Sequence, residues 1–235
     1  MRRLLTMITL CAGMSTTAFA ACRDNVVLVH GNTASPSSWN NTINELKRKG
    51  YVDSEIFTPD WGSKSCASCN DHNGSEETPV RNAILTAINQ SCTGKIDIIG
   101  HSMGGSAVAI ALSEGVESKK VVLISSPSSI ESVLKRFAKF IGLPTKSTQR
   151  FLNLVGENVG RSAESLNIAK LIQSNSSKGL IIHDKDDMEI PYADARTLEQ
   201  NWKGAKLIST QGYGHRSILR QKDVWASILG FVQEA

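Results

Sequence analysis

One short segment near the middle of the chain restricts the fold more than any other. A β-branched run at residues 96–99 (Ile-Asp-Ile-Ile) leads into residues 100–105 (Gly-His-Ser-Met-Gly-Gly), and a helix-prone, alanine-rich stretch follows. The pattern Gly-x-Ser-x-Gly is typical of a sharp turn between a strand and a helix, where glycines leave room for the two elements to approach. The segment therefore predicts a buried strand, a tight turn that presents Ser102, and a helix.

Further strands and helices alternate around this segment. Short, apolar, β-branched runs are typical of strands buried on both faces of a sheet, and they occur at about residues 25–30, 51–57, 95–100, 121–124, 180–182 and 206–209. Helical spacing of apolar residues marks about residues 38–49, 78–90, 103–114, 192–202 and 224–232. This alternation predicts an α/β fold with a mostly parallel sheet covered by helices on both faces.

About fifty residues, 127–177, show helical patterning without an obvious strand. Within them, apolar residues recur at helical spacing and mark one amphipathic face: Ile130, Val133, Leu134, Phe137 and Phe140. We expect this stretch to be a helical cap inserted over the carboxyl edge of the sheet. No internal repeat is visible, so the cap and the sheet are expected to form a single domain.

The first twenty residues are expected to be a signal peptide. Arg2 and Arg3 precede a short apolar stretch, and residues 18–20 (Ala-Phe-Ala) match a signal-peptidase site. Cleavage there would leave residues 21–235 as the exported domain, periplasmic or secreted. One alternative stays open, because residues 19–22 (Phe-Ala-Ala-Cys) resemble a lipobox that would make Cys22 a lipid-anchored N-terminus.

Composition is that of an ordinary globular domain, 40% hydrophobic and 20% charged. Without the two leader arginines, 24 basic residues face 22 acidic ones. Such a balance favours neither a nucleic-acid partner nor a membrane surface.

The exported domain would keep four cysteines: Cys22, Cys66, Cys69 and Cys92. An even number in an oxidising compartment predicts up to two disulfides, and three pairings are possible. The Cys66-x-x-Cys69 spacing also occurs in metal sites and redox pairs, but no second such pair is present and the flanking residues do not open a helix. A stapled surface loop is the simpler interpretation.

A serine hydroxyl becomes a nucleophile only beside a base and a group that stabilises the base's charge. In a fold with this serine turn, the order along the chain is nucleophile, acid, histidine. Two histidines follow Ser102, and His215, in a glycine-rich loop before the final helix, is the better candidate for the base. His183 ends a strand and is expected to be structural, and His101 is expected to point into the protein.

Three acidic residues follow His183: Asp184, Asp186 and Asp187. Asp187 lies at the tip of the loop after the strand, and Asp187 and Asp186 are the candidates for the acid. An oxyanion would be held by two backbone N–H groups. We expect these from Met103, directly after the serine, and from Asn32, in the loop after the first strand.

Taken together, these segments resemble a known family. Residues 27–39 (Val-Leu-Val-His-Gly-Asn-Thr-Ala-Ser-Pro-Ser-Ser-Trp), 60–62 (Asp-Trp-Gly) and 100–105 are similar to class 2 bacterial lipases of the α/β-hydrolase superfamily. Residues 183–191 and 212–219 resemble the wider superfamily. The resemblance implies an α/β-hydrolase fold and ranks Asp187 above Asp186. Asp184 departs from the family pattern, which often has glycine there, and the fifty-residue cap exceeds that of the smallest lipases.

The resulting hypothesis is an exported serine esterase or lipase that acts through an acyl-enzyme on Ser102, with no metal or organic cofactor. Its substrate would be a small-molecule or lipid ester. The same residues could serve a thioesterase, an amidase or an acyltransferase, and a non-catalytic ligand-binding relative is a further alternative. Basic residues outnumber acidic ones in the expected cap, which suggests transient contact with a lipid interface, although a solvated outer face is the simpler explanation.

Overall fold

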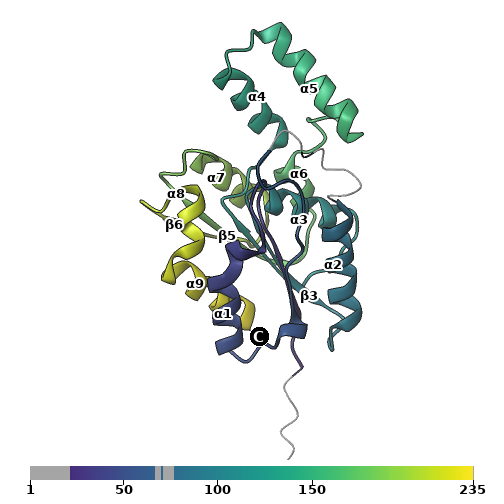
Figure 1. Ribbon diagram of the computed structural model, residues 1–235. Helices are drawn as coiled ribbons and strands as arrows, with labels where there is room; N and C mark the ends of the chain where they lie inside the picture. The colour runs from purple at the N-terminus through teal and green to yellow at the C-terminus, as the bar shows by residue number, and fades with distance from the viewer. Residues whose placement is uncertain (1–21, 67–69, 71–76, 235) are drawn as a thin grey trace, which may run out of the picture.

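A computed structural model describes residues 22–66, 70 and 77–234 (Figure 1). Within these residues, six strands form one sheet in the order β2-β1-β3-β4-β5-β6, and every neighbouring pair is parallel. The strands are β1 (Asn25–Val29), β2 (Ile56–Phe57), β3 (Ile96–His101), β4 (Lys120–Ile124), β5 (Lys178–Asp184) and β6 (Lys206–Thr210). The predicted parallel sheet is confirmed.

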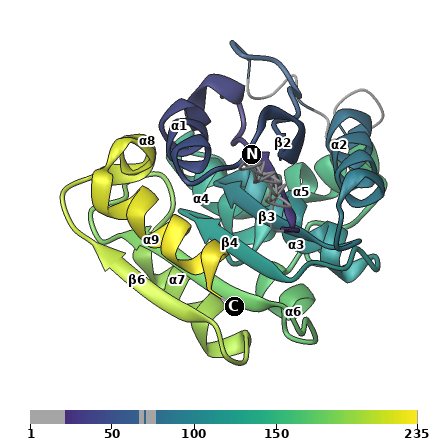
Figure 2. The ribbon, with the colours of Figure 1, turned by 90° about the horizontal axis from the view of Figure 1, so that it is seen from below.

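Different helices cover the two faces of the sheet (Figures 1 and 2). One face packs against α1 (Asn40–Arg48) and α9 (Lys222–Gln233). The other packs against α2 (Glu77–Gln90), α3 (Met103–Ser113), α6 (Ile168–Ile172) and α7 (Tyr192–Asn201). Shorter helical turns also occur: η1 (Pro36–Trp39), η2 (Asp53–Glu55), α8 (Gly214–Ser217) and η4 (Ile218–Arg220).

The apolar runs form strands because both faces of the sheet are buried. Val27 and Val29 of β1 contribute to the core under α2 and α3, whereas Val26 and Leu28 contribute to the core under α1 and α9. Successive side chains of a strand point to opposite faces, so a strand covered on both sides must be apolar at every position. The continuous runs of the sequence are explained by this double burial.

The strand expected at residues 51–57 is shorter in the structure. Only Ile56 and Phe57 pair with β1, and Asp53–Glu55 forms the turn η2 instead. Aspartate and serine at residues 53 and 54 favour turns over strands, and an edge strand gains hydrogen bonds from one neighbour only. The prediction was therefore wrong for residues 51–55.

Two helices stand away from the sheet beyond its carboxyl edge, α4 (Ile130–Phe140) and α5 (Thr145–Val159) (Figure 1). The Ser129 side chain caps α4 by accepting a hydrogen bond from the Ser132 amide, and α5 ends at Gly160, which adopts a φ of 72°. The helix α6, in contrast, belongs to the core layer, where Ile168 and Ile172 are fully buried.

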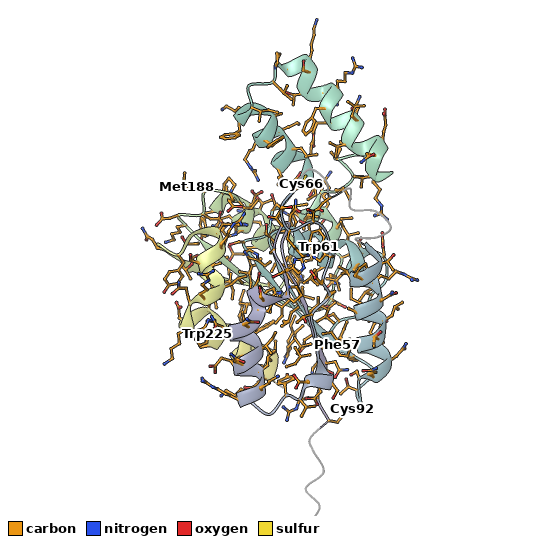
Figure 3. The ribbon with its side chains drawn as sticks, viewed as in Figure 1. Phe57, Trp61, Cys66, Cys92, Met188 and Trp225 are labelled. Carbon is orange, nitrogen blue, oxygen red and sulfur yellow. A yellow bond between two sulfur atoms is a disulfide. The ribbon has the colours of Figure 1, made fainter. Side chains whose placement is uncertain are left out.

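A disulfide joins Cys22 to Cys92, at the end of the molecule opposite α4 and α5 (Figure 3). It fixes the segment before β1 to the loop between α2 and β3. Cys69 lies outside the described residues, as do residues 1–20, so a second pairing and the signal peptide stay predictions. No helix in the described part of the chain is long and apolar enough to cross a bilayer.

Candidate active site

The serine turn connects β3 to α3 at the carboxyl edge of the sheet. Ser102 adopts φ 55° and ψ −126°, a region that residues other than glycine rarely occupy. Its amide donates to the Ile124 carbonyl oxygen over 2.9 Å, so the turn is tied to β4. This conformation turns the chain sharply between the strand and the helix.

The glycines around Ser102 are required by close packing. A Cβ at Gly104 would collide with the Val29 carbonyl oxygen, and one at Gly105 would collide with the Ser126 hydroxyl. A Cβ at Gly100 would lie 2.5 Å from the Gly105 Cα. Helix α3 can pack this closely on the strands only because residues 100, 104 and 105 have no side chain. The close packing at the turn therefore explains the glycine pattern.

His215 lies in α8, after β6, and contacts Asp187, in the loop after β5. The Nδ1 of His215 donates a hydrogen bond to Oδ2 of Asp187 over 2.8 Å. The other carboxylate oxygen of Asp187 accepts from the amides of Ile190 (2.8 Å) and Glu189 (2.9 Å). Burial would raise the pKa of Asp187, but the hydrogen bonds from His215 and Ile190 outweigh it and hold the pKa below its usual value. Asp187 is therefore a buried carboxylate that orients an imidazole.

Asp186, the alternative acid, points elsewhere and accepts a hydrogen bond from the Gly212 amide over 3.1 Å. Asp184 is fully buried and accepts from the Thr210 hydroxyl (2.7 Å) and the Tyr213 amide (3.0 Å). Asp184 thus ties the end of β5, and Asp186 the loop after it, to the segment that leads to His215. Asp184, which departs from the family pattern, has this anchoring role.

His101 and His183 are two further buried histidines near the site. His183 donates from Nε2 to the Ile190 carbonyl oxygen over 2.9 Å, and burial lowers its pKa. His101 donates from Nε2 to the His215 carbonyl oxygen over 2.9 Å, so it links β3 to the loop of His215. Burial first, and the nearby His215 ring second, lower the pKa of His101 to about 3.

The loop after β1 passes directly over the serine. A Cβ at Gly31 would lie 3.0 Å from the Ser102 Cβ, so only glycine fits comfortably at this crossing. The next residue, Asn32, lines the same cleft as Ser102 and Met103. Met103 is the first residue of α3, where backbone amides have no partner within the helix. Asn32 and Met103 are the two residues expected to supply oxyanion-binding amides, and both border the same cleft as Ser102.

Side chains beyond the predicted set hold this loop. The His30 ring stacks on Trp61 with ring centroids 5.3 Å apart, and the Trp61 indole donates to the His30 carbonyl oxygen over 3.1 Å. Asn70, which is buried, donates from Nδ2 to Oδ1 of Asn32 and accepts from the Ser63 amide over 2.6 Å. No local sequence pattern indicated Asn70, because its partner Asn32 is 38 residues away.

The cleft has a volume of about 1550 Å³ and is bordered by Ser102, His215 and residues of α4 and α5. The structure contains no hydrogen bond between the Ser102 hydroxyl and His215, although both side chains border the cleft. The Nε2 of His215 instead lies 3.7 Å from Oε2 of Glu189, which pairs with Arg216 over 3.0 Å. No group of three side chains suited to hold a metal ion occurs among the residues described.

Comparisons with known proteins place the chain in a family. The model of the family Lipase (class 2) matches residues 23–180, which is more than half of the sequence. No curated protein matches the chain.

Among solved structures, the chain resembles one described with the metagenome-derived lipolytic enzymes LipS and LipT, at 15% identity and a TM-score of 0.67, with 91% of this chain and 94% of that chain covered. It also resembles MGS-MChE2, an α/β-hydrolase from a lagoon-sediment metagenome (17%, TM-score 0.61, 89% and 90% covered). A third is the esterase EaEST from Exiguobacterium antarcticum (19%, TM-score 0.59, 90% and 92% covered). At these identities the likeness shows the fold. The chain belongs to the class 2 lipase family and has the α/β-hydrolase fold.

Proposed function

We propose that this hydrolase cleaves carboxylic esters through an acyl-enzyme on Ser102. The observation that carries the proposal is the 2.8 Å hydrogen bond between His215 and Asp187, at a cleft that Ser102 also borders. Membership of the lipase family supports ester hydrolysis. The geometry is a second support, because a buried acid, an imidazole and a serine at a strained turn are the groups that acyl transfer needs.

In the proposed reaction, the Ser102 oxygen attacks the ester carbonyl carbon as its proton passes to Nε2 of His215. Asp187 keeps the proton on Nδ1 and stabilises the imidazolium that forms. The carbonyl oxygen gains negative charge, which the amides of Asn32 and Met103 would stabilise. His215 then protonates the departing alcohol, and the serine is left acylated.

A water molecule completes the cycle. His215 removes a proton from the water, the hydroxide attacks the acyl carbon, and the proton returns to Ser102 as the carboxylic acid leaves. No step requires a metal or an organic cofactor.

Other reactions could use the same residues. A thioester or amide could replace the ester, or another alcohol could replace water, because the fold does not determine the leaving group or acceptor. A ligand-binding relative without activity would have no need of Ser102, His215 and Asp187 together. This is why catalysis is preferred to binding alone.

Hydrolysis of p-nitrophenyl esters from acetyl to palmitoyl tests the proposal. Ser102→Ala should lower kcat/KM by about 10⁴-fold or more, because the nucleophile is lost. Ser113→Ala is the matched control: its exposed hydroxyl lies on the same helix and donates to the Ile110 carbonyl oxygen of that helix. Ester hydrolysis is excluded for these substrates if the folded wild type is no faster than Ser102→Ala on every one.

We also propose that the protein is exported without a lipid anchor. The Cys22–Cys92 disulfide supports an oxidising compartment, since such bonds are rare where thiols are kept reduced. A sulfur in a disulfide cannot also form a thioether to a lipid, so this bond argues against lipidation at Cys22. Intact-mass measurement of the protein secreted or released from the periplasm should show an N-terminus at Ala21 and no lipid.

Contact with a lipid interface is proposed for the turn between α4 and α5. Phe140 is 87% exposed there and Ile141 is 49% exposed, beside the exposed Lys139 and Lys146. Apolar side chains flanked by cations are suited to anionic lipid surfaces. Phe140→Ser should weaken sedimentation with vesicles that contain phosphatidylglycerol, and equal binding of the variant and wild type would contradict this contact.

A further inference from the structure

Each ring nitrogen of His215 faces a carboxylate. Nδ1 donates to Oδ2 of Asp187 over 2.8 Å, and Nε2 lies 3.7 Å from Oε2 of Glu189. The proposed reaction uses the first contact and leaves the second unexplained. It requires Nε2 to exchange protons with Ser102, the leaving alcohol and water. Glu189 therefore places a negative charge at the nitrogen where the protons move.

The loop after β5 positions both carboxylates. The Glu189 amide donates to Oδ1 of Asp187 over 2.9 Å, so the backbone at Glu189 is tied to the group that orients the imidazole. The Asp187 side chain is fully buried, whereas that of Glu189 is 48% exposed and borders the cleft over Ser102. Glu189 thus has an anchored backbone and a side chain that solvent reaches, next to a buried ring.

The contact at Nε2 depends on the charge of the imidazole. In neutral His215 the proton is on Nδ1, so Nε2 presents a lone pair and has nothing to donate to Glu189. Once Nε2 is protonated, the ring is a cation and the carboxylate attracts it, even where water surrounds part of the pair. Glu189 then competes with the Ser102 oxygen for the Nε2 proton.

Arg216 opposes this competition. Its Nε donates to Oε1 of Glu189 over 3.0 Å, which leaves Oε2 as the oxygen nearest to Nε2. The positive charge of Arg216 also offsets part of the charge on the carboxylate. Because the Arg216 side chain is 67% exposed, its ion pair with Glu189 contributes little to stability. The main consequence of the pair is for the charge beside His215.

Two histidines from neighbouring strands complete the titratable surroundings of the ring. His101 of β3 has its ring centroid 5.0 Å from that of His215, and Nε2 of His183 of β5 lies 3.5 Å from Oδ2 of Asp187. Burial lowers the pKa of both histidines. The charged side chains at the ring are therefore Asp187 and Glu189, with Arg216 bound to Glu189.

We propose that Glu189 is a positioning residue that holds the protonated His215 imidazole off Ser102, and that Arg216 weakens this hold. The pair thereby sets the lower end of the pH range in which the base is free to act. This inference rests on the proposed ester hydrolysis and concerns the regulation of the same site.

The acid limb of the pH profile of kcat/KM tests the proposal, because it reports protonation of the base in the free enzyme. p-Nitrophenyl butyrate carries no charge, and its hydrolysis can be followed where p-nitrophenol and its anion absorb equally. Glu189→Gln should move the acid limb to lower pH by about 0.5 pH unit, since the imidazolium loses a nearby anion. Below the midpoint of the limb, kcat/KM should therefore increase by about threefold. Arg216→Gln should move the limb to higher pH.

Two controls separate the charge beside His215 from general effects. Glu199→Gln removes a glutamate of α7 that pairs with Arg196 and does not border the cleft, so the acid limb should stay in place. Arg216→Lys keeps the positive charge and should retain most of the wild-type profile. An unmoved limb in Glu189→Gln, or movement in the same direction in Glu189→Gln and Arg216→Gln, would overturn the proposal.

An NMR titration of the His215 ring provides a readout without turnover. Its Cε1–H resonance, assigned by its loss in His215→Gln, should titrate at lower pH in Glu189→Gln than in the wild type. Identical titrations would overturn the proposal even if esters were hydrolysed. Absence of ester hydrolysis by the wild type would overturn the proposed function instead, and the titration would still decide whether Glu189 holds the imidazolium.

Discussion

Asp187 and His215 come from loops that follow two neighbouring strands, β5 and β6, and Oδ2 of Asp187 accepts a hydrogen bond from Nδ1 of His215 over 2.8 Å. The preceding residue, Asp186, instead accepts a hydrogen bond from the Gly212 amide over 3.1 Å. Two adjacent carboxylates therefore have separate partners.

Asp187→Asn should lower kcat/KM by about 10⁴-fold, because an amide holds the imidazole in the wrong tautomer and cannot stabilise its positive charge. Asp186→Asn is the matched control, since its side-chain oxygen can still accept from Gly212, and it should lose less than about tenfold. Steady-state hydrolysis of p-nitrophenyl butyrate by both variants checks this. A larger loss in Asp186→Asn than in Asp187→Asn would reverse the assignment.

Asn70→Ala should lower kcat by about tenfold with little change in KM. Asn70 holds the Asn32 side chain, so its loss should loosen the loop whose amide would bind the oxyanion, a contact that matters most in the transition state. Asn44→Ala, an exposed change in α1, is the control. If KM alone increased in Asn70→Ala, the residue would act on substrate binding instead.

The fold could be predicted from the sequence wherever local pattern and tertiary burial agree. The strands β1, β3 and β4 are buried on both faces, so their apolar runs indicated them directly. The serine turn was predictable for a similar reason, because a Cβ at Gly104 would collide with Val29 of β1 and one at Gly105 with the Ser126 side chain after β4, which forces glycine at both positions.

Other features depend on contacts that no local pattern encodes. Helical spacing could not distinguish α6, packed in the core, from α4 and α5, which stand beyond the sheet. The choice between Asp186 and Asp187 depends on which carboxylate the Glu189 and Ile190 amides orient toward His215. The contribution of Asn70 arises from a contact across 38 residues of chain.

Stability should depend on pH through Asp97, a residue of β3 that is 1% exposed and far from the serine. Burial, and secondarily the charge of Asp24, raise the pKa of Asp97 to about 7 from an ordinary value of 3.8, although Lys119 and Lys120 oppose the shift. Between these values the folded protein holds a proton that the unfolded chain releases. The stability contributed by this proton therefore falls as the pH rises from about 4 to about 7.

Asp97→Asn should remove this contribution. His101 and His183, whose pKa values burial lowers, give a slope of the opposite sign, so the informative quantity is the difference between variant and wild type. Urea unfolding at pH 5 and pH 8 measures it, and the variant should gain relative stability at pH 8. Identical pH slopes for the two proteins would show that Asp97 is not protonated in the fold.

Cys92→Ser should lower the free energy of unfolding by about 4 kcal/mol, because the disulfide to Cys22 closes a loop of 70 residues in the unfolded chain. Cys22→Ser and the double variant should show the same loss, since each removes the same bond. Thermal unfolding with and without a reducing agent checks the effect. A larger loss in the double variant than in either single variant would indicate separate roles for the two cysteines.

The most direct test of the central claim is the site of covalent reaction with a fluorophosphonate. Intact-mass and peptide mass spectrometry of the reacted wild type should locate one adduct on Ser102. Ser102→Ala should show no adduct, and Asp187→Asn should react far more slowly. An adduct on another residue, or no adduct on the folded wild-type protein, would contradict the assignment of Ser102 as an activated nucleophile.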